Sequence, residues 1–244
     1  ITGASTGLGK AYAKIVAKQG GKLTIISRNK ERLKLAQDEL STISDYDVVA
    51  TSADVIDEQQ VLTAVKNGIE KHGTPDLVVA CAGLSTPGLF HELDSYSFKK
   101  QMDLNYFGSL YVVKAALPSM KTAKKGEILF VSSAMGLMGF AGYAAYCPTK
   151  YAVKGLADVL RNELSLYNIG VSIYFPNSID SPGFIQEQKT KPTTTNIIEG
   201  TDDVMSPEQA ADAMNVGFQQ GQTYITSDAM LELIRIGSNG ISPR

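Results

Sequence analysis

Short apolar runs alternate along this chain with longer segments in which apolar residues recur at helical spacing. The apolar runs predict buried strands at residues 22–27, 46–51, 76–81, 127–132 and 169–175. The longer segments predict helices at residues 11–20, 29–42, 57–72, 95–120 and 146–167. Because strands and helices alternate without a long linker or an internal repeat, we expect a single α/β domain over residues 1–244, built on one doubly wound parallel sheet.

The composition narrows the class of protein. Hydrophobic residues make up 43% and charged residues 20% of the 244 residues, which is typical of a globular domain with ample core. A net charge of −2 gives no electrostatic basis for binding nucleic acid, so we expect no such partner. The only two cysteines, Cys81 and Cys147, argue against a disulfide framework and fit a reducing compartment. We also predict no metal site.

The sequence contains no run of 18 or more apolar residues, so no part of it is expected to span a bilayer. The chain opens on Ile1-Thr2-Gly3, which resembles the end of a strand whose earlier residues are missing, and both ends look cut. The lack of a signal peptide or membrane anchor in this sequence is therefore weak evidence about the native protein.

Residues that can carry chemistry follow the predicted strands. In a parallel sheet of this kind, a ligand binds at the carboxyl ends of the strands, which all lie on one edge. The residues that follow strands are Gly3, Arg28, Asp54, Gly83, Ser133 and Pro176. Their convergence predicts one site at that edge.

The first candidate element is a glycine-rich turn, Thr2-Gly-Ala-Ser-Thr-Gly-Leu-Gly9, directly before a helical pattern. Glycine lets backbone amides approach a pyrophosphate, and a helix N-terminus adds partial positive charge. The spacing is TGxxxGxG, and many loops carry glycines for turn geometry only. The residues predicted to contact a dinucleotide here are Gly3, Ser5, Thr6, Gly7, Leu8 and Gly9.

The end of the predicted strand at 22–27 bears on the choice of cofactor. An acidic residue at this point of a Rossmann-type domain binds the ribose hydroxyl of NAD, whereas arginine pairs with the 2′-phosphate of NADP. The Ser27-Arg28-Asn29 sequence has a guanidinium and no carboxylate, so we expect NADPH. Arg28 could instead be a solvated surface residue, with Arg32 or Lys30 assisting or replacing it.

Two further turns are expected beside the cofactor. Asp54-Val55 follows the predicted strand at 46–51. There the Asp54 carboxylate could accept a hydrogen bond from the adenine amino group or cap the helix at 57–72. Ala82-Gly83 follows the predicted strand at 76–81, where glycine would again allow the backbone to approach the cofactor closely.

Tyr146 and Lys150 are four residues apart, so they share a helix face, and Pro148 between them indicates a first helical turn. The pKa of tyrosine is ordinarily about 10, and a neighbouring ammonium is expected to lower it toward the range of an acid–base catalyst. Ser133, at the end of the preceding strand, could hold a carbonyl oxygen beside the phenol. A lone YxxxK pattern is more often a half-buried aromatic and a solvated charge, so its surroundings decide.

Asn105 and Gly108 interrupt the helical stretch at 95–120. Both are poor residues for a helix interior, so they mark a local kink or a function. Because Leu104, Tyr106 and Phe107 crowd Asn105, a plain surface role is disfavoured.

Together these residues resemble the short-chain dehydrogenase/reductase family over nearly the whole chain. The matching pieces are TGASTGLG at 2–9, DV at 54–55, CAG at 81–83, Asn105, Ser133 and Tyr146-x-x-x-Lys150. The resemblance implies that Tyr146 is the general acid in reduction, that Ser133 orients the carbonyl, and that Lys150 lowers the tyrosine pKa and binds the nicotinamide ribose. It also implies that Asn105 holds a water in a proton relay to Lys150.

Two positions depart from the pattern of that family. Cys81 stands where asparagine is usual before the Ala-Gly pair. Pro176-Asn177 stands where Pro-Gly is usual after the strand at 169–175. The resemblance implies further cofactor contacts from Pro176 and Ser178, and it implies a homo-oligomer paired through helices 95–120 and 146–167.

Residues 145–169, and residues 178–200 with 206–211, resemble the 3-ketodihydrosphingosine reductases within that family, especially the fungal ones. This resemblance implies NADPH-dependent reduction of a long-chain sphingoid ketone in sphingolipid metabolism. It implies a catalytic domain on the cytosolic side of the endoplasmic reticulum membrane, held by anchors beyond the present ends. The rival hypotheses are reduction of a steroid, retinoid or 3-oxoacyl ketone, and a cofactor-binding module that has lost catalysis.

Apolar residues in two loops bear on the substrate. Met135 follows Ser133, and Phe184 follows the predicted strand at 169–175. Both could line an acyl channel, or they could merely pack a lid against the core. Residues 183–204 show no clear periodicity, and we expect a substrate lid at about 177–205. Asp180 could meet a substrate ammonium.

Overall fold

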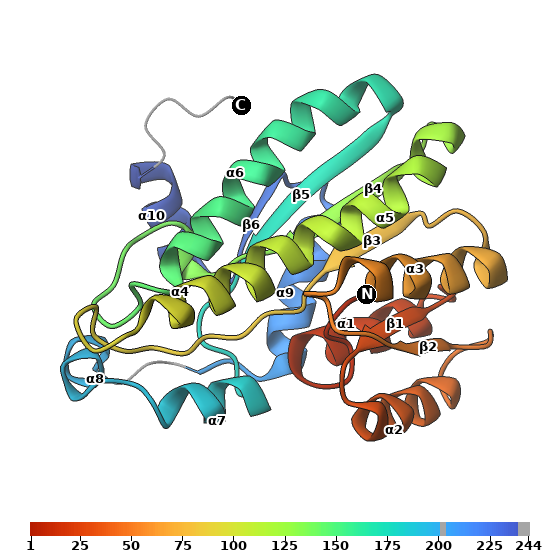
Figure 1. Ribbon diagram of the computed structural model, residues 1–244. Coiled ribbons are helices and arrows are strands. Elements are labelled where there is room, and N and C mark those ends of the chain that lie inside the picture. The colour runs from red at the N-terminus through yellow and green to blue at the C-terminus, as the bar shows by residue number, and fades with distance from the viewer. Residues whose placement is uncertain (201–203, 239–244) are drawn as a thin grey trace.

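Parallel strands form the centre of the computed structural model, which describes residues 1–200 and 204–238 (Figure 1). Two strands pair as β1-β2, and four pair in the order β3-β4-β5-β6, with every pairing parallel. Their bounds are β1 Thr24–Ser27, β2 Val49–Ser52, β3 Leu77–Ala80, β4 Gly126–Val131, β5 Ile169–Phe175 and β6 Tyr224–Thr226.

The first residues of the chain join the two groups of strands. Thr2 forms a parallel bridge with Ile26 of β1, and its backbone N–H donates to the carbonyl of Val79 in β3 at 3.0 Å. The backbone N–H of Ile26 donates in turn to the carbonyl of Ile1 at 3.0 Å. The strands therefore form one doubly wound sheet, and the predicted fold class is confirmed.

Helices cover both faces of this sheet. The longer α-helices are α1 Gly7–Lys18, α2 Lys30–Ser41, α3 Glu58–His72, α4 Ser95–Met102, α5 Gly108–Ala123, α6 Cys147–Leu164, α9 Pro207–Gln219 and α10 Ala229–Ser238. The helices α3, α5 and α6 pack on one face, and α1, α2 and α9 pack on the other. The shorter helical segments are the π-helix Asp103–Phe107, 3-10 turns at Ala134–Gly136 and Ser165–Tyr167, α7 Pro182–Gln188 and α8 Thr193–Glu199.

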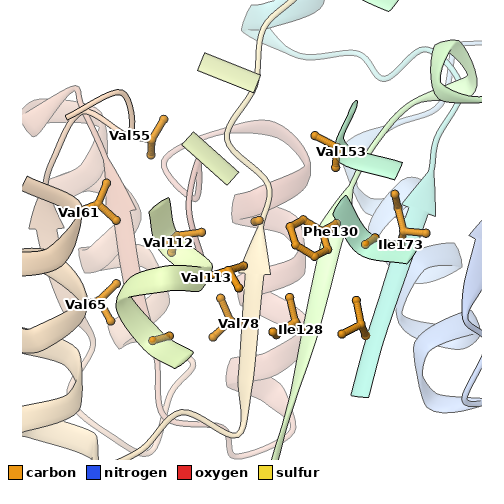
Figure 2. Close-up of a cluster of buried hydrophobic side chains, with 14 of the residues drawn as sticks. Val55, Val61, Val65, Val78, Val112, Val113, Ile128, Phe130, Val153 and Ile173 are labelled. Carbon is orange, nitrogen blue, oxygen red and sulfur yellow. The ribbon is translucent and has the colours of Figure 1, made fainter. Parts of the chain in front are cut away.

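The main core lies between the strands and the helices α3, α5 and α6. Val112 and Val113 of α5 lie over Val78, and Phe130 and Ile128 lie between that helix and β5 (Figure 2). Each of these side chains is at most 6% exposed. Burying such apolar surface provides most of the free energy that holds helix to sheet, and it fixes the strand ends that carry the site.

The structure corrects or extends several expected elements. The stretch at 95–120 is not one α-helix, because the π-helix Asp103–Phe107 separates α4 from α5 and places Asn105 at its centre. Residues 183–204, expected to lack regular structure, contain the helices α7 and α8. The helices α9 and α10 and the strand β6 were not predicted. Residues 201–203 of the expected lid lie outside the described residues.

None of the helices within residues 1–200 and 204–238 is both long enough and apolar enough to cross a bilayer.

Candidate active site

A cavity of about 860 Å³ opens at the carboxyl ends of the strands. Its walls come from the glycine-rich turn, from the ends of β1, β3, β4 and β5, and from α7 and α8. The helices α7 and α8 lie together beyond that edge of the sheet, at the lower left of Figure 1. The lining contains most of the predicted site residues, but it does not include Lys30, Asp54, Asn105 or Asp180.

The glycine-rich turn forms one end of the cavity. Gly3 and Gly7 have φ angles of +69° and +56°, which favour glycine, and a Cβ on Gly9 would lie 2.6 Å from the carbonyl oxygen of Gly3. Thr6, the N-cap residue of α1, makes no side-chain capping bond, and the first turn of α1 holds no acidic residue. The first amides of α1 are therefore open to an anion, so the turn fits the pyrophosphate of a dinucleotide.

Arg28 and Arg32 line the cavity next to this turn. The side chain of Arg28 is 58% exposed, and its Nη1 lies 3.6 Å from Oδ2 of Asp54. An exposed pair at this distance is weak, so the guanidinium can turn to a phosphate at little cost.

The expectation that Asp54 caps the helix at 57–72 is wrong. The N-cap residue is Asp57, whose carboxylate accepts from the backbone N–H groups of Gln59 and Gln60. Asp54 lies three residues too early to reach them, and its Oδ1 accepts instead from the N–H of Ile56 at 3.3 Å. The wall of the cavity at this point is made by Ala53 and Val55.

Gly83 lies where the cavity meets the polar side chains behind it. A Cβ on Gly83 would lie 3.0 Å from Oδ1 of Asn105 and 3.3 Å from Nζ of Lys150. A side chain at this position would press against both groups, so glycine lets them lie closest to the backbone of Ala82-Gly83. The neighbouring Cys81 is a free cysteine whose thiol pKa is raised by burial to about 11, so it is protonated at neutral pH.

Tyr146, Ser133 and Lys150 lie on one wall of the cavity. The helix α6 begins at Cys147 with Pro148 in its first turn, so Tyr146 is its N-cap residue and Lys150 lies one turn further. Lys150 is 5% exposed, and its Nζ lies 5.6 Å from the centre of the Tyr146 ring. The Nζ group donates to the carbonyl of Val131 at the end of β4, which holds the lysine against the sheet edge.

The expectation that Lys150 makes Tyr146 unusually acidic is wrong for this structure. Burial raises the pKa of Tyr146, the charge of Glu187 raises it further, and the nearby Ser133 hydroxyl only partly opposes them. Burial also lowers the pKa of Lys150 to about 8, since an ammonium loses hydration there. At neutral pH Tyr146 is therefore a neutral phenol, which is the form of a proton donor.

Asn105 is completely buried behind Gly83, in the π-helix. Its Oδ1 accepts from the N–H of Leu84, and its Nδ2 donates to the carbonyl of Leu84 and to Oγ1 of Thr149. Both amide hydrogens are therefore used to tie the loop after β3 to the first turn of α6. The predicted water relay to Lys150 stays a prediction.

Pro176, Asn177 and Ser178 follow β5 and also line the cavity. Asn177, where glycine is usual in the family that the chain resembles, donates from its side chain to Oδ2 of Asp228 at 2.6 Å. Its side chain is therefore turned toward the segment before α10, and its backbone remains on the cavity wall.

Apolar residues line the part of the cavity nearest α7. Met135 and Phe184 belong to this lining, together with Met138, Phe140 and Ile185. An apolar wall of this kind can line the channel of a long-chain substrate and can also pack against a lid.

Sequence reasoning missed a polar cluster in this same wall. Tyr143 donates to Oε1 of Glu187 at 2.6 Å and approaches Oε1 of Glu199 at 3.0 Å, and Nζ of Lys191 lies 2.6 Å from Oε2 of Glu199. All of these except Lys191 line the cavity. Tyr143 lies 44 positions before Glu187 and 56 before Glu199, so no local spacing links it to the two carboxylates.

Comparisons with known proteins agree with this geometry. Residues 1–192 match the family described as short chain dehydrogenase. The 3-dehydrosphinganine reductase of Danio rerio is 42% identical over 86% of this chain and 65% of its own length. The 3-ketodihydrosphingosine reductase TSC10 of Cryptococcus neoformans is 38% identical over 100% of this chain and 74% of its own length.

Among solved structures, an archaeal alcohol dehydrogenase from Thermococcus sibiricus, complexed with 5-hydroxy-NADP, superimposes with a TM-score of 0.80. It is 25% identical to this chain, and the match covers 93% of each protein. The present chain thus spans most of that enzyme, but only 65% of the length of the Danio rerio relative.

Proposed function

Since the chain belongs to the short chain dehydrogenase family, we propose that it is an oxidoreductase that reduces 3-ketodihydrosphingosine to dihydrosphingosine with NADPH, in sphingolipid biosynthesis. The observation that carries the proposal is the wall formed by Ser133, Tyr146 and Lys150 beside an open helix N-terminus in one cavity. The identity of 38–42% with sphingoid-ketone reductases supports this substrate class.

Each residue of this wall has a separate role in the proposed reaction. NADPH, when bound, supplies the hydride for the carbonyl carbon. Tyr146, a neutral phenol at neutral pH, gives its proton to the ketone oxygen, and the Ser133 hydroxyl donates a hydrogen bond to the same oxygen. Lys150, held by the carbonyl of Val131, lies at the correct edge to bind the nicotinamide ribose and to stabilise the phenolate that remains.

Arg28 and Arg32 are proposed to select NADPH over NADH. Their guanidinium groups line the cavity beside the glycine-rich turn, and Arg28 is held only by the weak contact with Asp54. A 2′-phosphate offers bidentate acceptors that a ribose hydroxyl lacks. The other proposed cofactor contacts are Gly3, Ser5, Thr6, Gly7, Leu8, Gly9, Asp54, Val55, Ala82, Gly83, Pro176 and Ser178.

The experiment is an oxidation assay of NADPH and NADH, with 3-ketodihydrosphingosine and with steroid, retinoid and 3-oxoacyl ketones, followed by mass spectrometry of the products. We expect NADPH to be consumed with the sphingoid ketone, and Tyr146→Phe to lower kcat at least about 100-fold because the proton donor is lost. A variant that kept the wild-type rate would remove Tyr146 from this role. Equal use of NADH would contradict the role of Arg28.

We further propose that residues 177–205 form a lid over the substrate and that the domain works at the cytosolic face of the endoplasmic reticulum membrane. Exposed apolar side chains next to the cavity, Ile185 and Ile198, support a lipid substrate that arrives from a membrane. Fractionation of cells that make the full-length protein checks the location. The proposed homo-oligomer is checked by light scattering, where a monomer at micromolar concentration would contradict it.

A further inference from the structure

The polar cluster beside Tyr146 carries an excess of negative charge. Two carboxylates, Glu187 at the end of α7 and Glu199 at the end of α8, face one ammonium, that of Lys191. The side chains are largely removed from solvent, with exposed fractions of 17% for Glu187, 11% for Glu199 and 2% for Lys191. A buried carboxylate without a cation is costly, so an arrangement of this kind favours a further positive charge.

The two carboxylates are not equivalent. Glu199 is paired with Lys191, because Nζ lies 2.6 Å from its Oε2, whereas the same Nζ lies 3.7 Å from Oε1 of Glu187. Glu187 accepts from Tyr143 through Oε1, and the approach of the Ser85 hydroxyl to this carboxylate falls short of full hydrogen-bond geometry. Glu187 is therefore the carboxylate left to receive an additional donor.

A second observation concerns Ser85, which is 6% exposed and lines the same cavity. Its hydroxyl has no partner of full hydrogen-bond geometry in the described chain, and its approach to Glu187 lowers the pKa of that carboxyl. A buried hydroxyl without a partner is uncommon in folded proteins and indicates that a ligand group is accommodated next to it. Ser85 and Glu187 thus leave acceptor capacity unused at one place on the wall.

This place is close to the reacting atoms of the proposed reaction. The rings of Tyr143 and Tyr146 have centroids 6.1 Å apart, and Tyr143 contacts Glu187 directly. The charge of Glu187 reaches the phenol of Tyr146, where it raises the pKa. A cation bound to Glu187 would therefore lie next to a ketone oxygen held by Tyr146.

We propose that Glu187 binds the substrate's ammonium group and selects a 2-amino-3-ketone over a plain ketone of the same chain length. The inference rests on the proposed function, because a sphingoid ketone carries its amino group on the carbon next to the carbonyl. With the carbonyl oxygen at Tyr146, the ammonium lies one carbon further along the wall that Tyr146 shares with Tyr143 and Glu187. Asp180, considered from the sequence, is exposed and lies outside the cavity lining, which favours Glu187 for this role.

Binding in this way would also lower the pKa of Tyr146. The ammonium of the substrate would neutralise Glu187 and remove the carboxylate charge that opposes ionisation of the phenol. The substrate would thereby remove a negative charge that opposes the stabilisation of the phenolate by Lys150.

The experiment compares kcat/KM for 3-ketodihydrosphingosine and for the 3-ketone of equal chain length without the amino group. In the wild-type protein we expect the amino ketone to be preferred roughly 10- to 100-fold, mainly through KM, since a charged hydrogen bond is gained. Glu187→Gln should lose this preference by slowing only the amino ketone. Asp180→Asn, the matched control, should keep it.

A second measurement needs no variant and no turnover. Calorimetry with dihydrosphingosine and with its N-acetyl derivative should show at least about 10-fold tighter binding of the free amine, because acetylation removes the charge. Equal affinities, or equal losses for both ketones in Glu187→Gln, would overturn the role of Glu187. Reduction of neither ketone, with the amine still bound through Glu187, would overturn the proposed reaction and leave this binding site standing.

Discussion

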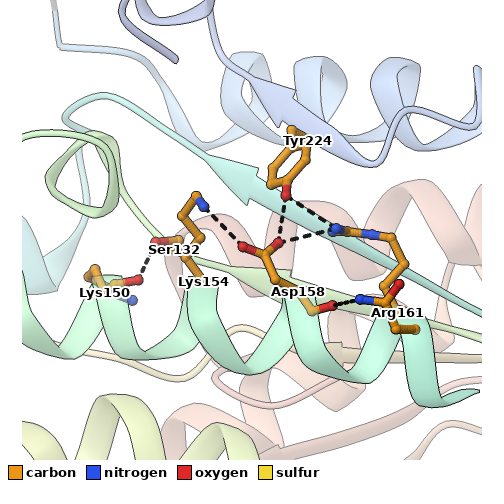
Figure 3. A network of polar contacts seen from close by, with 7 residues as sticks. Ser132, Lys150, Lys154, Asp158, Arg161 and Tyr224 are labelled. Carbon is orange, nitrogen blue, oxygen red and sulfur yellow. Dashed lines mark hydrogen bonds and ion pairs between the residues drawn. The ribbon is translucent and has the colours of Figure 1, made fainter. Parts of the chain in front are cut away.

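Two polar clusters in this molecule use the same kinds of side chain for opposite purposes. On α6, Asp158 pairs with Lys154 and Arg161 and accepts from Tyr224 of β6 at 2.6 Å (Figure 3). In the cavity wall, Glu187 and Glu199 share one lysine and one tyrosine. Each cluster centres on a tyrosine hydroxyl that donates to a carboxylate.

The two clusters differ in charge balance. One carboxylate faces two cations on α6, whereas two carboxylates face one cation at α7 and α8. Although burial opposes it, hydrogen bonds from Tyr224 and Lys154 hold the pKa of Asp158 below its ordinary value. Burial raises the pKa of Glu187 above its ordinary value, and the hydrogen bond from Tyr143 offsets only part of that effect. The cluster around Asp158, in which the carboxylate has enough cations, holds α6 against β6. The cluster around Glu187 and Glu199, which has fewer cations than carboxylates, borders the cavity.

The largest difference is expected when each cluster loses a lysine. Lys191→Met should destabilise the fold by about 3 kcal/mol, because it leaves two buried carboxylates without a cation. Lys154→Met should cost about 1 kcal/mol or less, because Arg161 remains 3.1 Å from Asp158. Urea unfolding at pH 7 measures both values. Equal losses would show that the clusters do not differ in charge balance.

A smaller difference is expected when each cluster loses its phenol hydroxyl. Tyr143→Phe should cost about 2 kcal/mol, since buried carboxylate oxygens lose a donor. Tyr224→Phe should cost about 1 kcal/mol, since Asp158 keeps its two cations. Thermal unfolding of the two variants beside the wild type gives the comparison, and a larger loss for Tyr224→Phe would count against it.

The smallest expected effect is a pair of opposite pH dependences. With a raised pKa, Glu187 stabilises the folded state below its ordinary value of about 4.3 and loses this contribution as pH rises through the raised value. With a lowered pKa, Asp158 stabilises the folded state above its ordinary value of about 3.9 and loses this contribution as pH falls through the lowered value.

The measurement is the free energy of unfolding across the acid range for the wild type, Glu187→Gln and Asp158→Asn. The advantage of the wild type over Glu187→Gln should shrink as pH rises, and its advantage over Asp158→Asn should shrink as pH falls. Parallel curves for the two variants would contradict the assignment of opposite pKa shifts.

Local pattern was enough to predict much of the molecule. Apolar runs and helical spacing located the first five described strands and the helices between them, because burial on a sheet imposes its own periodicity on the chain. The strand ends placed Gly3, Arg28, Gly83, Ser133 and Pro176 on one edge, since parallel strands end together. Pro148 correctly located the first turn of α6.

Long-range contacts decided what local pattern could not. The acidity of Tyr146 depends on its burial and on the nearby charge of Glu187 from α7, and both raise its pKa. Asp57 rather than Asp54 caps α3, because capping depends on the residue at which the helix begins. The charge cluster of Glu187, Glu199 and Tyr143 exists only after α7 and α8 fold over the cavity.

The sequence by itself therefore determined the class of fold, the edge of the sheet that carries the site, and the residue types available for chemistry there. Only the tertiary structure decided the protonation of those residues and the polar groups that face the substrate. The physical reason is that periodicity reports burial along one element, whereas desolvation and charge balance arise from groups that distant segments bring together.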